Sequence, residues 1–226
     1  MCGICGIVNF KANGPVDRSL VERMNSAQAH RGPDDDGYFI ENKVGLGHRR
    51  LSIIDVSGGK QPIFNEDGSV VVVFNGEIYN FADLRNNLVA HGHRFKTHSD
   101  TETIVHSYEQ YGDECMQEFR GMFAFALWDR KRRRLLLVRD RLGIKPVYYY
   151  KGPDFFVFAS EIKSLLQHPG VPREVDPQAV DLYLALRYVP GPRTMFKDIF
   201  KLQPGHWMAV DEDGIRIQKY WDLEYQ

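Results

Sequence analysis

The chain opens with MCGICGIVNF (residues 1–10), a run of small, β-branched and aromatic residues with little polarity. Such a run predicts a buried β-strand that starts almost at the first residue. Cys2 and Cys5 have the Cys-x-x-Cys spacing of a redox pair or of half a zinc site. A redox pair is expected on a helix after a strand, and a zinc site would need two further ligands, for which the other thiol, Cys115, and two remote histidines are the candidates. We therefore expect Cys5 to pack as a small apolar strand residue.

Cys2 differs from Cys5 because a small second residue permits removal of the initiator Met1. That removal would leave a cysteine with a free α-amino group, whose ordinary pKa of about 7.7–8.0 leaves a useful fraction neutral at physiological pH. One residue would then supply both a nucleophilic thiol and the base that activates it.

Length and composition bound the remaining choices. The 226 residues suffice for one large domain or two small ones, and 43% apolar and 26% charged residues are typical of a globular protein in water. A formal net charge of −1 provides no long-range field to attract nucleic acid or an anionic membrane. Three cysteines, with no signal-peptide pattern and no apolar run of bilayer-spanning length, predict a cytoplasmic protein.

Hydrophobic patterning predicts many strands and a few helices. Strands or hairpins are expected at YFIE (38–41), VGLGHRRLSIID (44–55), EDGSVVVVFNGEIYN (66–80), MFAFALWDRKRRRLLLVRD (122–140), KPVYYYKGPDFFVFAS (145–160) and around residues 211–214. Helices are expected over residues 16–29, 81–90, 100–119 and 176–187, the last of these after the capping pair Asp176-Pro177. Many strands packed against helices indicate an α+β protein with stacked sheets and helices outside.

The chain resembles the glutaminase domain of class II glutamine amidotransferases, specifically that of glutamine-hydrolysing asparagine synthetases. The matching segments follow the family's order: MCGICGIV, HRGPDDDG, GHRRLSIID, FNGEIYN, THSDTETI, GMFAFALWD, RDRLGIKPVYY and FASEIKSLL. The later YVPGPRTMFKDIFKLQPGH is typical of the asparagine synthetase branch. Sister branches that make glucosamine phosphate or phosphoribosylamine usually carry Thr-Arg-x-Ala-Thr where this chain has HRRLSI.

The resemblance implies the N-terminal-nucleophile (Ntn) hydrolase sandwich, αββα, with residues 1–226 as one glutaminase domain. It also implies hydrolysis of L-glutamine to L-glutamate and ammonia through a thioester on Cys2, with the ammonia supplied to an ATP-dependent amidation. No cofactor is expected in this domain, because ATP and Mg²⁺ belong to a synthetase domain with a Ser-Gly-Gly-x-Asp-Ser loop that these residues lack. We expect that domain as the continuation of an excised chain, or else on a separate subunit. Homodimer formation is left open, and neither nucleic acid nor membrane is expected as a partner.

The resemblance further assigns roles to ten residues. Cys2 corresponds to the nucleophile, and Asn75 and Gly76 correspond to the oxyanion hole, because an Asn amide and a Gly N–H can both donate to one developing oxyanion. Arg50 is similar to the arginine that binds the α-carboxylate of glutamine, and Asp100 to the carboxylate that binds its α-ammonium. Further residues expected to line the pocket are Glu77 and the stretch Leu51, Ser52, Ile53 and Ile54.

Each of these residues has a plainer interpretation when it is taken alone. Arg50, like its neighbour Arg49, suits a strand edge or the surface. Asp100 suits a helix N-cap, and Asn75-Gly76 suits a hairpin turn. The competing class of function is therefore a binding or structural module that keeps the fold without activity. The joint occurrence of all these residues in the family's order favours the enzyme.

Three other features have structural interpretations. The basic run DRKRRR (129–134) is predicted to be a solvated hairpin turn, with a docking patch for another domain as the alternative. The segment HRGPDDDG (30–37) is predicted to be a loop, in which Arg31, Gly32 and Asp34 shape the cover of the site. We expect surface or helix-end positions, and no metal site, for His91, His93, His98 and His106.

Overall fold

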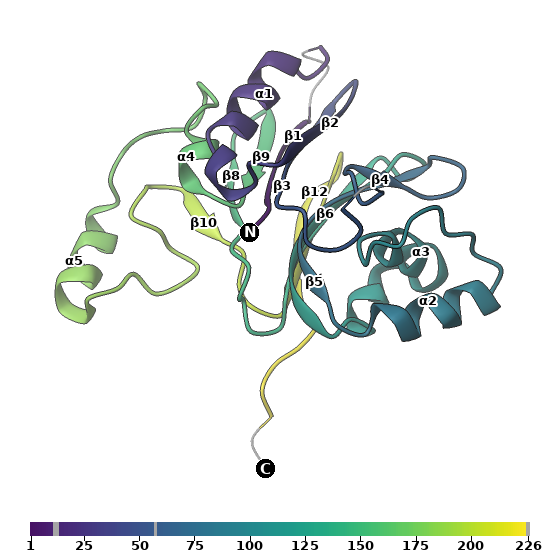
Figure 1. The fold of residues 1–226 in the computed structure, drawn as a ribbon. Coiled ribbons are helices and arrows are strands. Elements are labelled where there is room, and N and C mark those ends of the chain that lie inside the picture. The colour runs from purple at the N-terminus through teal and green to yellow at the C-terminus, as the bar shows by residue number, and fades with distance from the viewer. Residues whose placement is uncertain (11–13, 57, 225–226) are drawn as a thin grey trace.

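Two antiparallel six-stranded sheets stack face to face in the computed structural model, which describes residues 1–10, 14–56 and 58–224 (Figure 1). In the first sheet the strand order is β10 (Ile199–Lys201), β8 (Tyr148–Lys151), β9 (Phe155–Ala159), β1 (Gly3–Asn9), β3 (Val44–Arg50) and β2 (Asp35–Glu41). In the second sheet it is β12 (Gly214–Lys219), β11 (His206–Asp211), β7 (Arg134–Arg139), β6 (Gly121–Asp129), β5 (Val70–Ile78) and β4 (Ile63–Phe64).

Helices cover the outer face of each sheet, which gives the layer order αββα (Figure 1). Helices α1 (Arg18–Ser26) and α4 (Ile162–Leu165) pack on the first sheet, and α2 (Phe81–Ala90) and α3 (Glu102–Tyr111) lie over the second. Helix α5 (Pro177–Leu186) stands away from the other helices, and two 3₁₀ turns, η1 (Ala29–Arg31) and η2 (Gly112–Gln117), complete the elements. The predicted sandwich is confirmed.

The three hydrophobic layers follow from the alternation of side chains along each strand. In β5, Val71 and Val73 face the first sheet and pack in the same cluster as Ile4 of β1. Val72 and Phe74 face the opposite way and pack with the residues of α3. Since the strand is buried on both faces, its sequence is a continuous apolar run and does not alternate with polar residues.

Most predicted elements form, and their ends differ for identifiable reasons. The helix expected over 16–29 begins only after Asp17, whose carboxylate accepts from the Ser19 N–H at 2.9 Å as an N-cap. The helix expected over 100–119 is divided, because Gly112 has a φ of 60° that ends α3 before the 3₁₀ turn begins. The first part of the expected loop 30–37 is η1, and the last part belongs to β2. The strand expected over 44–55 ends at Arg50.

The basic run 129–134 forms the tip of the β6–β7 hairpin, as predicted. Its cations are paired with carboxylates of the same domain: Arg130 with Glu41 (2.6 Å), Lys131 with Asp67 (2.8 Å), Arg133 with Glu212 (3.8 Å) and Arg134 with Asp113. The charge of the run is therefore largely neutralised within the fold. Among the helices that the structure describes, none has the length and apolar character that crossing a membrane requires.

Candidate active site

The site forms where the inward-facing residues of β3 and β5 change from apolar to polar along each strand. Along β3, the residues that face the second sheet run from Val44 and Leu46 to Arg50. Along β5, the series that begins at Val71 reaches Asn75 two residues after Val73. The alternation that builds the core therefore also sends polar groups from both sheets into one space.

A buried histidine links the two sheets beside this space. His48 of β3 donates from Nε2 to the carbonyl oxygen of Phe74 in β5 at 3.0 Å. Burial lowers the pKa of His48 to about 3, so that the ring is neutral at physiological pH. The sequence did not indicate this residue, although it lies within the family-like segment GHRRLSIID.

A cavity of about 180 Å³ brings nine of the ten predicted site residues together. Its lining includes Cys2, Arg50, Leu51, Ile53, Ile54, Asn75, Gly76, Glu77 and Asp100. The tenth residue, Ser52, is absent from the lining, and its N–H donates to the carboxylate of Asp34 at 2.8 Å. That contact ties the loop after β3 to the segment HRGPDDDG.

Backbone groups hold the thiol of Cys2, the residue that directly precedes β1. Its Sγ accepts from the Leu51 N–H at 3.3 Å and lies 3.6 Å from the Leu51 carbonyl oxygen. The carbonyl of Cys2 accepts from Nε of Arg31 at 2.9 Å, and Arg31 also pairs with Glu161 at 3.2 Å. Burial raises the pKa of the Cys2 thiol, while the Leu51 N–H, the chain terminus and Arg50 act in the opposite direction.

Cys5 is a different kind of residue, as the sequence predicted. It is fully buried among the side chains under α1, and burial raises the pKa of its thiol to about 12. Cys115 is also fully buried, on the other side of the molecule in the core under α3, and its thiol pKa is raised by the same cause.

Two unused hydrogen-bond donors on β5 face the cavity. The side-chain amide of Asn75 is 1% exposed, and neither its nitrogen nor its oxygen has a partner among the described residues. The second donor follows from the register. Gly76 lies opposite Phe123, whose own N–H and C=O are bonded to Asp140 on the far side of β6. In an antiparallel pair this makes Gly76 a non-hydrogen-bonded position, so that its N–H points away from β6.

The neighbours of Gly76 show where that N–H points. Phe74 and Ile78 occupy the same kind of position, and their N–H groups donate to Gln61 Oε1 at 2.7 Å and to Asp100 Oδ2 at 3.0 Å. Gly76 lies between them, on the edge of β5 that borders the cavity. A Cβ atom here would lie 2.3 Å from the Met122 carbonyl oxygen of β6, which explains why the position requires glycine. Asn75-Gly76 is thus part of a strand and forms no hairpin turn.

Arg50 carries a buried positive charge that is held by backbone carbonyls. Its side chain is 6% exposed, and the guanidinium donates to the carbonyls of Ile54 (3.3 Å), Asp55 (2.6 Å) and Val56 (2.9 Å). Within the described ranges no carboxylate oxygen lies within 4 Å of it. The carbonyls of the loop therefore fix the orientation of the guanidinium, and its positive charge remains available to attract an anion.

Asp100 carries the complementary negative charge. Its carboxylate is 4% exposed, accepts from the Ile78 N–H, and lies 3.4 Å from the Ser99 hydroxyl that donates to it. Burial raises the pKa of Asp100, opposed by these hydrogen bonds. The residue that begins α3 as N-cap is Thr101, so the carboxylate of Asp100 contacts β5.

Several cavity residues were not predicted. Strand β4 pairs with Val71 and Val72 of β5, and beyond it the side-chain amide of Gln61 bonds to both backbone groups of Phe74. Gln61 lies in no conspicuous motif and has no local sequence signal. Lys145 has one, because it belongs to the family-like segment RDRLGIKPVYY. The remaining unpredicted lining residues are Met1, Gly59, Phe74, Ser99, Thr101 and Met122.

This sandwich, with a thiol and two opposite buried charges in its cavity, is that of a glutamine amidotransferase domain. The glutamine amidotransferase domain family matches residues 1–221, and the chain belongs to that family. It is 40% identical over 227 residues to the glutamine-hydrolyzing asparagine synthetase 3 of Bacillus subtilis (strain 168), which covers 99% of this chain and 37% of the relative. It is 41% identical over 229 residues to asparagine synthetase 1 of the same organism, which covers 100% of this chain and 36% of the relative.

A solved structure shares the fold. The glutamine phosphoribosylpyrophosphate amidotransferase from B. subtilis superposes with a TM-score of 0.68 at 18% identity, over 97% of this chain and 49% of that chain. At that identity the likeness concerns the fold alone. The chain spans about a third of the length of the two asparagine synthetases, 37% and 36%.

Burial predicts that the three thiols react unequally. Iodoacetamide should label Cys2 alone in the folded protein that retains Met1, because Cys5 and Cys115 are fully buried. Since the pKa of the Cys2 thiol lies above its ordinary value of 9.0, the labelling rate should still rise beyond pH 9. Intact mass and peptide mapping measure both. Label on Cys5 or Cys115 under native conditions, or a rate that levels off below pH 9, would contradict this arrangement, and Cys2→Ala is the control.

Proposed function

We propose that the chain hydrolyses L-glutamine to L-glutamate and ammonia through a thioester on Cys2. The observation that carries the proposal is the convergence of three chemistries in one small cavity. A thiol, two unused N–H donors and a pair of opposite buried charges all line it. A binding module without activity would have no need for a thiol beside unused donors.

The charges would hold the end of glutamine that does not react. On this proposal the Arg50 guanidinium binds the α-carboxylate and Asp100 binds the α-ammonium, which is supported by the position of both charged groups in the cavity lining. With that end fixed, the carboxamide would extend toward Cys2. Glu77 and the residues Leu51, Ile53 and Ile54 would form the walls, and Ser52 would support them through its contact with Asp34.

The reaction would proceed in two halves. In the first, the α-amine of Cys2 takes the thiol proton and the sulfur attacks the carboxamide carbon. The carbonyl oxygen becomes an oxyanion that accepts from the Asn75 amide and the Gly76 N–H. The C–N bond then breaks, and the amine returns its proton to the departing ammonia, which leaves a γ-glutamyl thioester. In the second half, water attacks the thioester with the same amine as base, and glutamate and the free thiol result.

This mechanism requires the removal of Met1. While Met1 is attached, the nitrogen of Cys2 is a peptide nitrogen and cannot act as a base. Met1 also lines the cavity, so that its removal would enlarge the space in front of the thiol. The Leu51 N–H would remain as the contact that holds the sulfur in place.

We further propose that residues 1–226 act as the ammonia-producing part of an asparagine-synthetase-like system in the cytoplasm. The names of the B. subtilis relatives and their greater length support this, since they leave room for a second domain. That domain, on the same polypeptide or a separate subunit, would use ATP and Mg²⁺ to amidate a carboxylate. The glutaminase half-reaction itself needs no cofactor.

The direct test is a glutaminase assay with defined N-termini. The chain that begins with Cys2 should release glutamate from glutamine, and the chain that retains Met1 should not, because its amine is blocked. Mass spectrometry verifies each terminus, and Cys2→Ala in the processed form is the control. Absence of glutamate release by the processed wild-type chain would refute the proposed activity. Release by Cys2→Ala at the wild-type rate would refute the role of the thiol.

The proposed binding of glutamine by Arg50 and Asp100, here called the charge clamp, can be tested with a matched pair of arginines. Arg50→Ala should raise the KM for glutamine about 30-fold or more, which corresponds to the ~2 kcal/mol lost with one partner of a buried charge pair. Arg49→Ala should leave KM within about twofold, because Arg49 points outward and contacts the Asn25 carbonyl and Asp36. Asp100→Asn should raise KM as Arg50→Ala does. Equal KM values for the Arg49 and Arg50 variants would show that the clamp lies elsewhere.

The oxyanion donor can be tested separately from binding. Asn75→Ala should lower kcat by about 10²–10³-fold and change KM little, because its amide contacts only the charge that develops in the transition state. Steady-state kinetics measure both parameters. An unchanged alkylation rate of Cys2 would verify that the cavity is intact. A kcat within threefold of wild type would remove Asn75 from the mechanism.

A further inference from the structure

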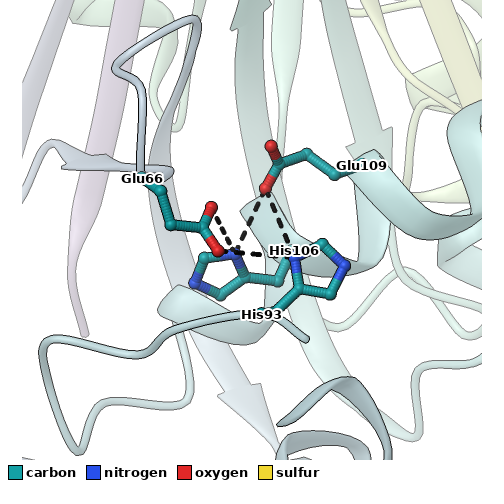
Figure 2. A group of neighbouring side chains, drawn as sticks. All are labelled: Glu66, His93, His106 and Glu109. Carbon is teal, nitrogen blue, oxygen red and sulfur yellow. Dashed lines mark hydrogen bonds and ion pairs between the residues drawn. The ribbon is translucent and has the colours of Figure 1, made fainter. Parts of the chain in front are cut away.

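A second group of polar side chains lies outside the cavity, beside α3. Glu66 comes from the turn between β4 and β5, His93 from the loop after α2, and His106 and Glu109 from neighbouring turns of α3. Figure 2 shows the four side chains converging on one point. The expectation of a surface or helix-end position is wrong for His106, which is fully buried within α3, and its ring centroid lies 5.1 Å from that of His93.

We propose that Glu66, His93, His106 and Glu109 form a binding site for one zinc ion. Each residue directs one nitrogen or oxygen atom toward the others, and these four atoms all lie within 4.8 Å of one another. Nδ1 of His106 is 3.3 Å from Glu66 and 3.2 Å from Glu109, and Nδ1 of His93 is 3.5 Å and 3.8 Å from the same carboxylates (Figure 2). In a tetrahedron with metal–ligand bonds of about 2.0–2.1 Å, ligand atoms are about 3.3–3.4 Å apart.

The outer contacts of the group resemble those that orient metal ligands. A metal-bound histidine usually directs its other ring nitrogen to a carboxylate, and Nε2 of His106 lies 3.5 Å from Oε1 of the buried Glu102. The second oxygen of Glu109 accepts from the Asn65 side-chain amide at 2.7 Å. One oxygen of Glu66 accepts from the Arg94 N–H at 2.9 Å. Both glutamates are thus held in place by a further hydrogen bond.

Charge and ligand type favour zinc over the alkaline-earth ions. Two carboxylates and two neutral imidazoles carry a charge of −2, which a divalent cation balances. Imidazole nitrogen suits Zn²⁺, whereas Ca²⁺ and Mg²⁺ prefer oxygen ligands alone. His106 is fully buried, while the side chains of Glu66 and Glu109 are 32% and 27% exposed, so that an ion can reach the group from solvent.

The site would have a structural role. It would join the β4–β5 turn, the loop after α2 and helix α3, which hydrogen bonds also connect at this corner. The same loop continues from His93 to Asp100 of the cavity. The competing explanation is a metal-free group in which a protonated His106 is held by carboxylates.

Equilibrium dialysis against Zn²⁺, followed by metal analysis, separates the two explanations. The full chain, stripped with a chelator, should bind one Zn²⁺ per chain, and four-coordinate binding should give intense visible absorption when Co²⁺ replaces zinc. His93→Gln should weaken zinc binding about 100-fold or more. His91→Gln is the matched control, because it removes an exposed imidazole two residues away whose Nδ1 is bonded to the Asn87 carbonyl at 2.9 Å.

Two further variants separate loss of the zinc site from loss of the fold and from zinc binding by the Cys2 thiol. Glu109→Gln, at a partly exposed position, should also weaken zinc binding while circular dichroism shows an intact fold. Cys2→Ala should retain the zinc, which would exclude the reactive thiol as its ligand. The proposal is overturned if the stripped chain binds no zinc stoichiometrically, if His93→Gln and Glu109→Gln bind zinc as the wild type does, or if Cys2→Ala abolishes binding.

Discussion

The face-to-face packing of two sheets imposes one constraint from which the site follows. Alternate residues of β3 and β5 must point into the space between the sheets, and apolar side chains fill that space along most of its length. Where the apolar series ends, the same positions hold Arg50 and Asn75. The neutral ring of His48, which bonds across to β5, marks the boundary between core and cavity. Positioning of the polar groups therefore requires no separate scaffold.

A second constraint lies at the edge of β5. The neighbouring strand β4 pairs with only two of its residues, so that the N–H groups further along β5 must find other partners. Phe74 bonds to Gln61 and Ile78 to Asp100, which leaves the Gly76 N–H facing the cavity between them. A strand edge that would otherwise be exposed thus becomes the position of an unused donor, and Asp100 is fixed to the strand that supplies it.

The features of the fold and site that depend on residues close together in the chain could be predicted from the sequence, and those that depend on distant contacts could not. The helix over 81–90, the hairpins and the contrast between Cys2 and Cys5 depend on residues close together in the chain, and the structure agrees with each. Periodicity alone did not determine the layer order, which came from the family resemblance. Gln61 could not be found because its partner, Phe74 of β5, lies thirteen residues further along the chain. The grouping of His93 with His106 depends on how the loop after α2 folds back on α3, which no short pattern encodes.

The position of the charges has a consequence for how a catalytic cycle ends. On the proposed function, Arg50 and Asp100 contact the half of glutamine that hydrolysis leaves unchanged, so they hold glutamate as firmly as glutamine. Discrimination between substrate and product then lies wholly at the other end, where the new carboxylate meets a cavity that already contains Glu77. Product inhibition is built into such a clamp. Electrostatic repulsion at the reacting end is what would clear the cavity for the next molecule.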